Sequence, residues 1–538
     1  MNGERGKIIT SLRHRLRIEA ALREMLEAPT ASEFEAMAQR IARQGAQVVP
    51  VLVANLGTSD QRFRAALGAV ASHLAHEEIS YALREVVMEP GRSDQERATA
   101  LMILERFLDE EIGDDLYLEL VDPLEVARQS LREAAVGAES DRQVYVEYLR
   151  SLEQETTEVA LLVLQAAETM EPATVVEPLR LLALDPRSEV ASEALRILGT
   201  IRMPTAVQAL ESLAPCLPQE RRPWAQRAQR KLLMAGVPAQ PKTPLEEHCR
   251  LLVSPADDQG NFSIWVLEVV HPDRVVNLVT VMLDMAQGIT ECVGVPALAE
   301  MPLQWAPQVG AVHRLSLPWR GEALMLLEAE PAYAVRWMEE GVAQALAQAG
   351  CLPWGYRVWG HSIWGYDLPQ PTPQPQADLS PERAQALLAQ SGQLLAHPAF
   401  DAWPSGGHGA AALLSGWHGT GAPSQRTAAG AELVKRFVEG HWDAQHLEST
   451  RRSLLANSEW LRLAGAGGLA ELALAAALGL SIEGRGEHPL LTALAERALA
   501  LAWEESRQKS ATDRRPKDEL ARANPGEKST TPLEEVSS

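Results

Sequence analysis

The stretch SDQRFRAALGAVASHL, residues 59–74, returns 34 positions later as SDQERATALMILERFL, residues 93–108. Weaker copies begin near Asp141, Asp185 and Gln219. Self-similarity at a period of this length is typical of stacked helical repeats, in which each unit buries its apolar face against its neighbours. The repeat therefore predicts that residues 1–237 are an α-solenoid.

The chain between residues 32 and 237 alternates pairs of helices joined by short turns rich in Asp, Ser and Pro. The first helices carry a proline, Pro50 or Pro178, which we expect in the first turn, where backbone N–H groups lack intrahelical partners. The carboxylates of Asp60, Asp94 and Asp185 are expected to cap the second helices by accepting such N–H groups.

Two of these segments resemble HEAT repeats of the type that occurs in bilin lyases. The first matches the repeat's Asp, Arg and Ala-Leu-Gly positions through Asp60, Arg64, Ala65, Ala66, Leu67 and Gly68. The second matches through Val190, Ala191, Ala194, Leu195, Leu198 and Gly199, with Ala191 where the family usually has Arg. The resemblance covers about residues 30–237. It implies a solenoid fold and identifies no catalytic residue.

Composition changes after residue 237. A proline-rich stretch is followed by β-branched and aromatic runs bounded by turn residues, which are typical of strands. We expect strands at residues 261–270, 275–284 and 288–296 and an amphipathic helix at residues 331–349. Residues 245–368 are therefore predicted to form a small α+β domain.

The remaining chain divides by composition into a linker, a helical region and a tail. Residues 369–380 are rich in Pro and Gln, which predicts an extended linker. Residues 381–506 have a helical, Ala/Leu-rich pattern. Residues 507–538 contain few large apolar side chains and are predicted to be disordered. The expected fold class is mainly α, with a HEAT-like solenoid, a small α+β domain and a C-terminal helical region; whether residues 245–506 form one domain or two stays open.

The formal net charge of −22 disfavours non-specific binding to nucleic acid or to an anionic membrane, because the field repels phosphate. The N-terminus lacks the apolar core of a secretory signal. The most apolar stretch, residues 472–480, is far shorter than the roughly 20 residues that a membrane span needs. We therefore expect a cytoplasmic protein that has no membrane partner.

The sequence contains none of the standard catalytic or nucleotide-binding motifs, which favours a non-enzymatic protein with no cofactor. The four cysteines are scattered without metal-ligand spacing, and each is interpreted as a buried small apolar residue. His73 and His76 could reach one metal ion if they lay one turn apart on a helix. Polar residues at a helix end explain the pair equally simply, and we assign no metal site.

The segment WGYRVWGHSIWGY, residues 354–366, is unusual because it holds three of the 13 tryptophans and two of the seven tyrosines. The tryptophans recur every five residues, a spacing that fits neither an α-helix nor a strand. Such rings can contact a ligand or anchor a partner, and alternatively they can cover a core. The residues proposed for ligand or partner contact are Trp354, Tyr356, Arg357, Trp359, His361 and Trp364.

The resemblance and the absent motifs favour a scaffold or adaptor that binds proteins of unknown identity on the concave surface of the repeats. An alternative is a ligand-handling enzyme, because repeats of this type occur in lyases that attach bilins to phycobiliproteins. A third alternative is nucleic-acid binding, which the net charge disfavours.

Overall fold

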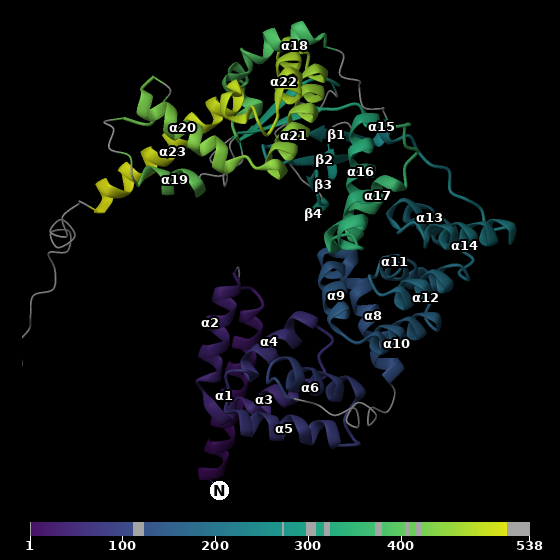
Figure 1. The fold of residues 1–538 in the computed structure, drawn as a ribbon. Coiled ribbons are helices and arrows are strands. Elements are labelled where there is room, and N and C mark those ends of the chain that lie inside the picture. The colour runs from purple at the N-terminus through teal and green to yellow at the C-terminus, as the bar shows by residue number, and fades with distance from the viewer. Residues whose placement is uncertain are drawn as a thin grey trace, which may run out of the picture. The chain divides into compact units, whose positions relative to one another are not determined.

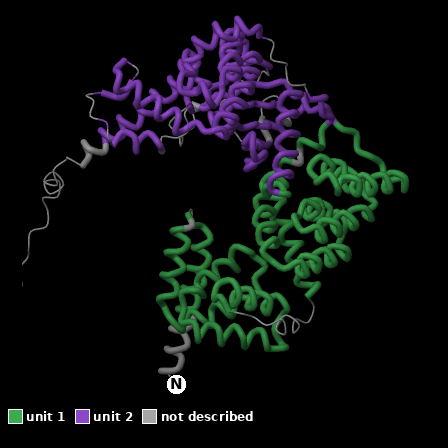
Figure 2. Tube along the Cα trace, in the orientation of Figure 1, with its two compact units in different colours: residues 1–242, 350–366 green, residues 243–349, 367–538 purple. Residues whose placement is uncertain are grey.

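The computed structural model describes residues 2–28, 30–110, 123–271, 274–296, 308–316, 323–371, 379–403, 408–415, 417, 421–424 and 426–513. The described chain is mainly helical and contains a six-stranded antiparallel sheet (Figure 1). It divides into two compact units (Figure 2): unit 1 is residues 1–242 with 350–366, and unit 2 is residues 243–349 with 367–538. No helix in the described residues is long and apolar enough to cross a bilayer.

The first part of unit 1 is a set of helices that share one apolar core. They are α1 (Asn2–Met25), α2 (Ala31–Ala42), α3 (Val49–Ala54), α4 (Gln61–Ala71), α5 (His76–Met88) and α6 (Asp94–Arg106), with a 3₁₀ turn η1 (Gly45–Gln47) before α3. Leu22, Ile41, Leu67, Ile79 and Leu101 are among the buried residues of this core. The two copies of the sequence repeat occupy α4 and α6, as their periodicity predicted.

The second part of unit 1 continues the helices in pairs. They are α8 (Pro123–Ser140), α9 (Gln143–Gln154), α10 (Thr157–Glu168), α11 (Pro172–Leu182), α12 (Ser188–Leu198), α13 (Pro204–Leu213), η2 (Ala214–Cys216) and α14 (Arg222–Met234). Helices two apart in the chain contact each other. One series runs α8, α10, α12, α14 and the other runs α9, α11, α13, so each helix packs on the equivalent helix of the pair before it.

The helix caps agree with the sequence prediction at one of three positions. Asp60 caps α4, because its carboxylate accepts a hydrogen bond from Phe63 N at 3.2 Å. The cap of α6 is Ser93 rather than Asp94, since Ser93 forms a reciprocal capping box with Glu96. Asp185 lies before the cap of α12 and instead accepts hydrogen bonds from Arg187.

The two prolines also differ in position. Pro50 lies in the first turn of α3, as predicted. Pro178 lies inside α11, because that helix begins earlier, at Pro172. Pro172, the first residue of α11, occupies the position where a missing N–H carries no penalty.

Unit 2 is built on a sheet of strand order β4-β3-β2-β1-β6-β5. The strands are β1 (Cys249–Val253), β2 (Asn261–His271), β3 (Arg274–Asp284), β4 (Gly288–Pro296), β5 (Val312–Ser316) and β6 (Ala323–Glu328). The three predicted strands correspond to β2, β3 and β4. Strand β1 escaped prediction because all of its residues are buried, so it lacks the alternation that marks a strand in sequence.

Helix α16 (Pro331–Ala349) packs against this sheet where β4 begins. Gly288 has φ +85°, and a Cβ atom there would lie 2.3 Å from Gly341 O. Phe262 and Trp337 meet edge to face with ring centroids 5.1 Å apart. The glycine is thus required both by its backbone conformation and by the close approach of the helix.

The helices that follow belong to the same compact unit as the sheet. They are α18 (Pro381–Leu388), α19 (His408–Leu414), α20 (Ala428–His441), α21 (Ala444–Leu463), α22 (Gly467–Gly479) and α23 (Pro489–Asp513), with a short helix α15 (Leu245–His248) before β1 and 3₁₀ turns η4 (Ser391–Ala396), η5 (Pro398–Phe400) and η6 (Arg485–Glu487). The indole N–H groups of Trp403 and Trp460 donate to Ala256 O at 2.9 Å and Val253 O at 2.8 Å. These bonds join the helical region directly to the strand β1 and the loop after it.

The division into units differs from the domain boundaries expected from composition. Residues 350–366, grouped by sequence with the α+β domain, belong to unit 1, whereas residues 381–506 share unit 2 with the sheet. Helix α23 continues to Asp513, so the first residues of the expected tail are helical. Residues 514–538 and linker residues 372–378 lie outside the described part of the chain.

His488 gives unit 2 a predictable dependence on pH. Its side chain is buried, Nε2 lies 3.1 Å from Ala476 O, and Nδ1 accepts from Leu491 N. Burial lowers the pKa of His488 below its ordinary value of 6.5. Below that pH the unfolded chain binds a proton that the folded chain resists, so the free energy of unfolding decreases as the pH falls.

We therefore expect His488→Gln to reduce the loss of stability between about pH 7.5 and pH 5.5. Chemical denaturation followed at several pH values measures this loss. The same substitution at His446, which is exposed, serves as the control and should leave the loss undiminished. An equal pH dependence in the wild type and the His488 variant would contradict the assignment.

Candidate functional site: a tryptophan and arginine strap on the repeat helices

Residues 350–366, called the strap below, contain the aromatic segment that the sequence singled out. They form a π-helical turn η3 (Tyr356–Gly360) followed by the short helix α17 (His361–Trp364). Of the three tryptophans, Trp359 lies in the π-helical turn, Trp354 precedes it and Trp364 ends α17, so their five-residue spacing spans different local structures. Gly360 is needed because a Cβ atom there would lie 2.4 Å from the Tyr356 ring.

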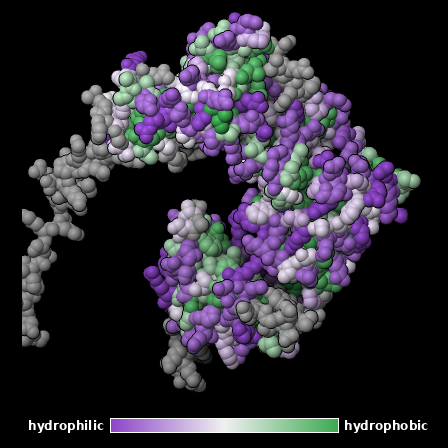
Figure 3. Space-filling view, in the orientation of Figure 1, coloured by the Kyte–Doolittle hydropathy of each residue, from purple (hydrophilic) through white to green (hydrophobic). Residues whose placement is uncertain are grey.

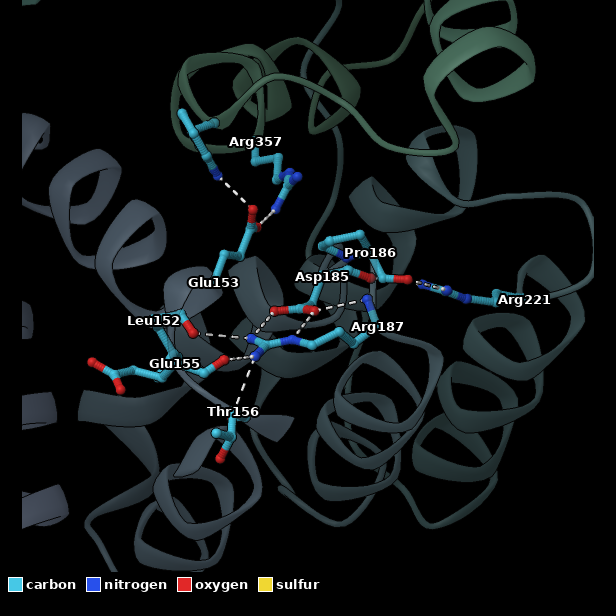
Figure 4. A network of polar contacts seen from close by, with 10 residues as sticks. Leu152, Glu153, Glu155, Thr156, Asp185, Pro186, Arg187, Arg221 and Arg357 are labelled. Atoms are coloured by element: carbon cyan, nitrogen blue, oxygen red, sulfur yellow. Dashed lines mark hydrogen bonds and ion pairs between the residues drawn. The ribbon is translucent and has the colours of Figure 1, made fainter. Parts of the chain in front are cut away.

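Glu153, near the end of α9, is the first anchor of the strap (Figure 4). Its carboxylate accepts a hydrogen bond from Trp354 Nε1 at 2.8 Å and pairs with the guanidinium of Arg357. Arg357 is only 2% exposed, and its Nε donates to Leu352 O at 2.7 Å. Arg150 lies over the Trp354 ring, 4.9 Å from the centroid. One carboxylate of the repeat helices thus holds two strap side chains.

Two arginines of the repeat helices form the second anchor by binding backbone carbonyls of the strap. Arg142 donates to Val358 O at 3.0 Å, and Arg180 donates to Arg357 O at 2.9 Å. Glu177 on α11 pairs with both arginines and orients them. Arg142 also lies 5.7 Å from the centroid of the Trp359 ring. Backbone carbonyls are present in any peptide. These two hydrogen bonds therefore depend on the backbone conformation of the strap and not on the identity of its side chains.

The predicted contact residues of the strap are mostly buried. Tyr356, Arg357, Trp359 and Trp364 are buried and Trp354 is half-buried, whereas the side chain of His361 lies outside the described residues. Tyr356 Oη accepts a hydrogen bond from Trp364 Nε1 at 3.1 Å. The structure therefore brings these rings onto the repeat helices of unit 1 rather than onto an open surface of unit 2.

A ladder of arginines joins successive turns beneath this site (Figure 4). Arg187 donates to Glu155 O at 2.9 Å and to Leu152 O at 3.2 Å, at the end of α9. Arg221 donates to Asp185 O at 2.9 Å and to Pro186 O at 3.2 Å, after the end of α11. The carbonyls at the end of a helix lack intrahelical partners, and the planar guanidinium can satisfy several of them. Each turn is thereby tied to the turn of the preceding pair.

The ionisable groups near the strap have structural partners or raised pKa values. Burial raises the pKa of the Cys216 thiol to about 12, and burial together with Glu177 raises the pKa of Tyr145 to about 12. Both groups are protonated at neutral pH. Arg142, Glu153, Glu177, Arg180 and Arg357 pair with one another or with carbonyls, and Arg150 contacts the Trp354 ring, which is the arrangement of an anchor for a peptide segment.

The histidine pair considered from sequence does not share a helix. His73 follows the end of α4 and lies 2.5 Å from Glu35, whereas His76 begins α5 and lies 3.3 Å from Glu110. Within the described residues, no three His, Cys, Asp or Glu side chains come together as metal ligands would.

Sequence reasoning missed the residues that receive the strap, which are Arg142, Arg150, Glu153, Glu177 and Arg180. Each is an ordinary charged residue in or next to a helix, and none carries a local signal that it receives a distant segment. The arginine ladder was marked in the sequence, because Arg187 and Arg221 are one repeat period of 34 residues apart. Each directly precedes the second helix of its pair, α12 or α14. A comparison of equivalent repeat positions would have identified that pair.

Comparisons with known proteins add no relative to this picture: no protein-family model, no curated protein and no solved structure matches the chain.

Proposed function

We propose that this chain is a non-enzymatic protein-interaction adaptor whose N-terminal helices form a HEAT-like α-solenoid. The observation that carries the proposal is the strap: the repeat helices hold a segment that is distant in sequence through one carboxylate, two arginines that bind carbonyls, and contacts between arginines and tryptophan rings. Residues 350–366 thus provide, within the chain itself, an example of a peptide bound on repeat helices. Binding other protein segments on the concave surface requires the same chemistry.

The contacts between helices support the solenoid part of this proposal. Helices of each series pack on the helix two before them, and the ladder of Arg187 and Arg221 repeats the link between turns. In such an array each helix pair contacts only its neighbouring pairs. The residues that point away from these contacts are therefore not needed for packing. Those residues are then available to recognise a partner. Figure 3 shows that the visible surface over α8–α12 is largely hydrophilic, as expected for a face that contacts water.

The experiment that tests the adaptor function is isolation of the tagged full-length chain from its own host under mild conditions. Co-purifying proteins are identified by mass spectrometry, and the absorption spectrum of the same sample is recorded. We expect a protein partner in stoichiometric amount and no visible chromophore. A coloured sample without a protein partner, or a sample rich in nucleic acid that dissociates with salt, would contradict the proposal.

A further inference from the structure

Helix α14, at the end of one helix series, presents an exposed face that is both basic and apolar. Ala225 and Leu232 are buried, whereas Trp224 is 45%, Leu233 39% and Met234 89% exposed. Residues 224, 227, 231 and 234 lie on one side of the helix because they follow its 3.6-residue period. In Figure 3 the end of the unit where α14 lies carries hydrophobic residues beside hydrophilic ones.

The charge of this face is opposite to that of the whole chain. Helix α14 contains four basic residues and no Asp or Glu, in a protein of net charge −22. Arg222 is used within the fold, since it donates to Leu217 O at 2.8 Å. Arg227 and Arg230 use Nε for carbonyls of their own helix. Among the described residues, no carboxylate pairs with Arg227, Arg230 or Lys231, so their charges face outward.

The position of α14 makes its apolar residues unexpected. It contacts α12 and α13, and it is the last member of its series in the described residues of unit 1. The terminal helix of a repeat array normally has a polar outer face, which keeps the array soluble. An exposed Trp and Met among arginines is instead the composition of an interface centre, where Trp and Arg contribute most of the binding energy.

We propose that the exposed face of α14 docks an acidic protein segment that carries large apolar side chains. The proposal rests on the adaptor function and names the chemistry of its partner. Asp or Glu side chains of that segment pair with Arg227, Arg230 and Lys231, and its apolar side chains cover Trp224 and Met234. An acidic protein segment fits better than nucleic acid, because the charge of the whole chain repels a long polyanion whereas a short acidic segment contacts only the local basic face.

The test measures binding of fluorescein-labelled synthetic peptides to the full-length chain by fluorescence anisotropy. One peptide alternates Glu with Leu; its counterparts replace Glu by Lys or Leu by Ser. Oligothymidylate serves as the competing polyanion. The variants are Arg227→Glu with Lys231→Glu, and Trp224→Ala with Met234→Ala. The control reverses two exposed charges at the C-terminal end of α2, on Arg40 and on its C-cap Arg43: Arg40→Glu with Arg43→Glu.

We expect saturable binding of the Glu–Leu peptide only, weakened about tenfold or more by either α14 variant and unchanged in the control. The charge-reversed α14 variant should gain affinity for the Lys–Leu peptide. Equal binding by wild type and α14 variants, no saturable binding, or preference for oligothymidylate would each overturn the inference.

Failure of this docking face can be distinguished from failure of the adaptor function. If a partner co-purified equally with the wild type and the α14 variants, the adaptor function would stand and the docking face on α14 would be refuted. If peptide binding depended on α14 but no protein co-purified, the docking face would stand and the adaptor function would be contradicted.

Discussion

Replacing Glu153 by alanine is expected to reduce the free energy required to release the strap from the repeat helices by about 3–5 kcal/mol. The variant leaves the guanidinium of Arg357, which is almost fully buried, without its carboxylate, and leaves Trp354 Nε1 without its acceptor. An unpaired charge in a low-dielectric site costs far more than the pair contributes. Native-state hydrogen exchange of the strap amides measures the release directly, and local opening can be followed without unfolding the rest of the chain.

Two variants separate this explanation from general damage to α9. Glu147→Ala removes an exposed carboxylate from the same helix and is expected to change strap protection by less than about 0.5 kcal/mol. Glu153→Ala combined with Arg357→Met leaves no charge behind, so it should be less damaging than Glu153→Ala alone. Equal effects of the single and double variants would show that the ion pair does not hold the strap.

Replacing Glu459 by alanine is expected to destabilise unit 2 by about 3–5 kcal/mol. Glu459 on α21 accepts two hydrogen bonds from Arg336 on α16, at 3.0 and 2.6 Å, and both side chains are about 6% exposed. Arg336 is enclosed further by the rings of Tyr333 and Trp337, whose centroids lie 5.2 and 5.1 Å from its guanidinium carbon. Without Glu459 this charge stays buried, and denaturant unfolding followed by circular dichroism should show the loss.

Glu448→Ala provides the matched control on the same helix. Glu448 pairs with Arg451 and Arg452 at 3.1 Å, with side chains about half exposed. Surface pairs contribute about 0–1 kcal/mol, so this variant should remain close to the wild type. Similar losses for Glu448→Ala and Glu459→Ala would mean that burial is not the source of the effect.

Local elements were predictable wherever the signal was contained in a short stretch of sequence. The repeat at residues 59–74 and 93–108 located α4 and α6, and the β-branched runs located β2, β3 and β4. The cap of α6 was misplaced by one residue, because Ser93 and Asp94 are both good caps. The choice between them depends on the turn geometry that lets Ser93 and Glu96 bond reciprocally.

The strap shows the limit of the same reasoning. Its five-residue aromatic spacing marked it as unusual, yet composition grouped it with the neighbouring α+β domain. Its partners were not predictable, because Glu153 and Arg357 are 204 residues apart and each alone is an ordinary charged residue. Burial of Arg357 is possible only because folding delivers Glu153 to it.

The sequence by itself determined the mainly helical character, three of the six described strands, the repeat period and the acidic charge of this protein, because periodicity, capping and composition act over neighbouring residues. Only the tertiary structure decided that residues 350–366 belong to the repeat helices and that Arg336 meets Glu459. It also showed that α14 keeps a basic, apolar face exposed. The strap and the Arg336–Glu459 pair depend on contacts between distant segments, which are stabilised by burial and charge pairing only once the chain has folded. The exposed face of α14 depends on which helices pack beside it and which side they leave uncovered.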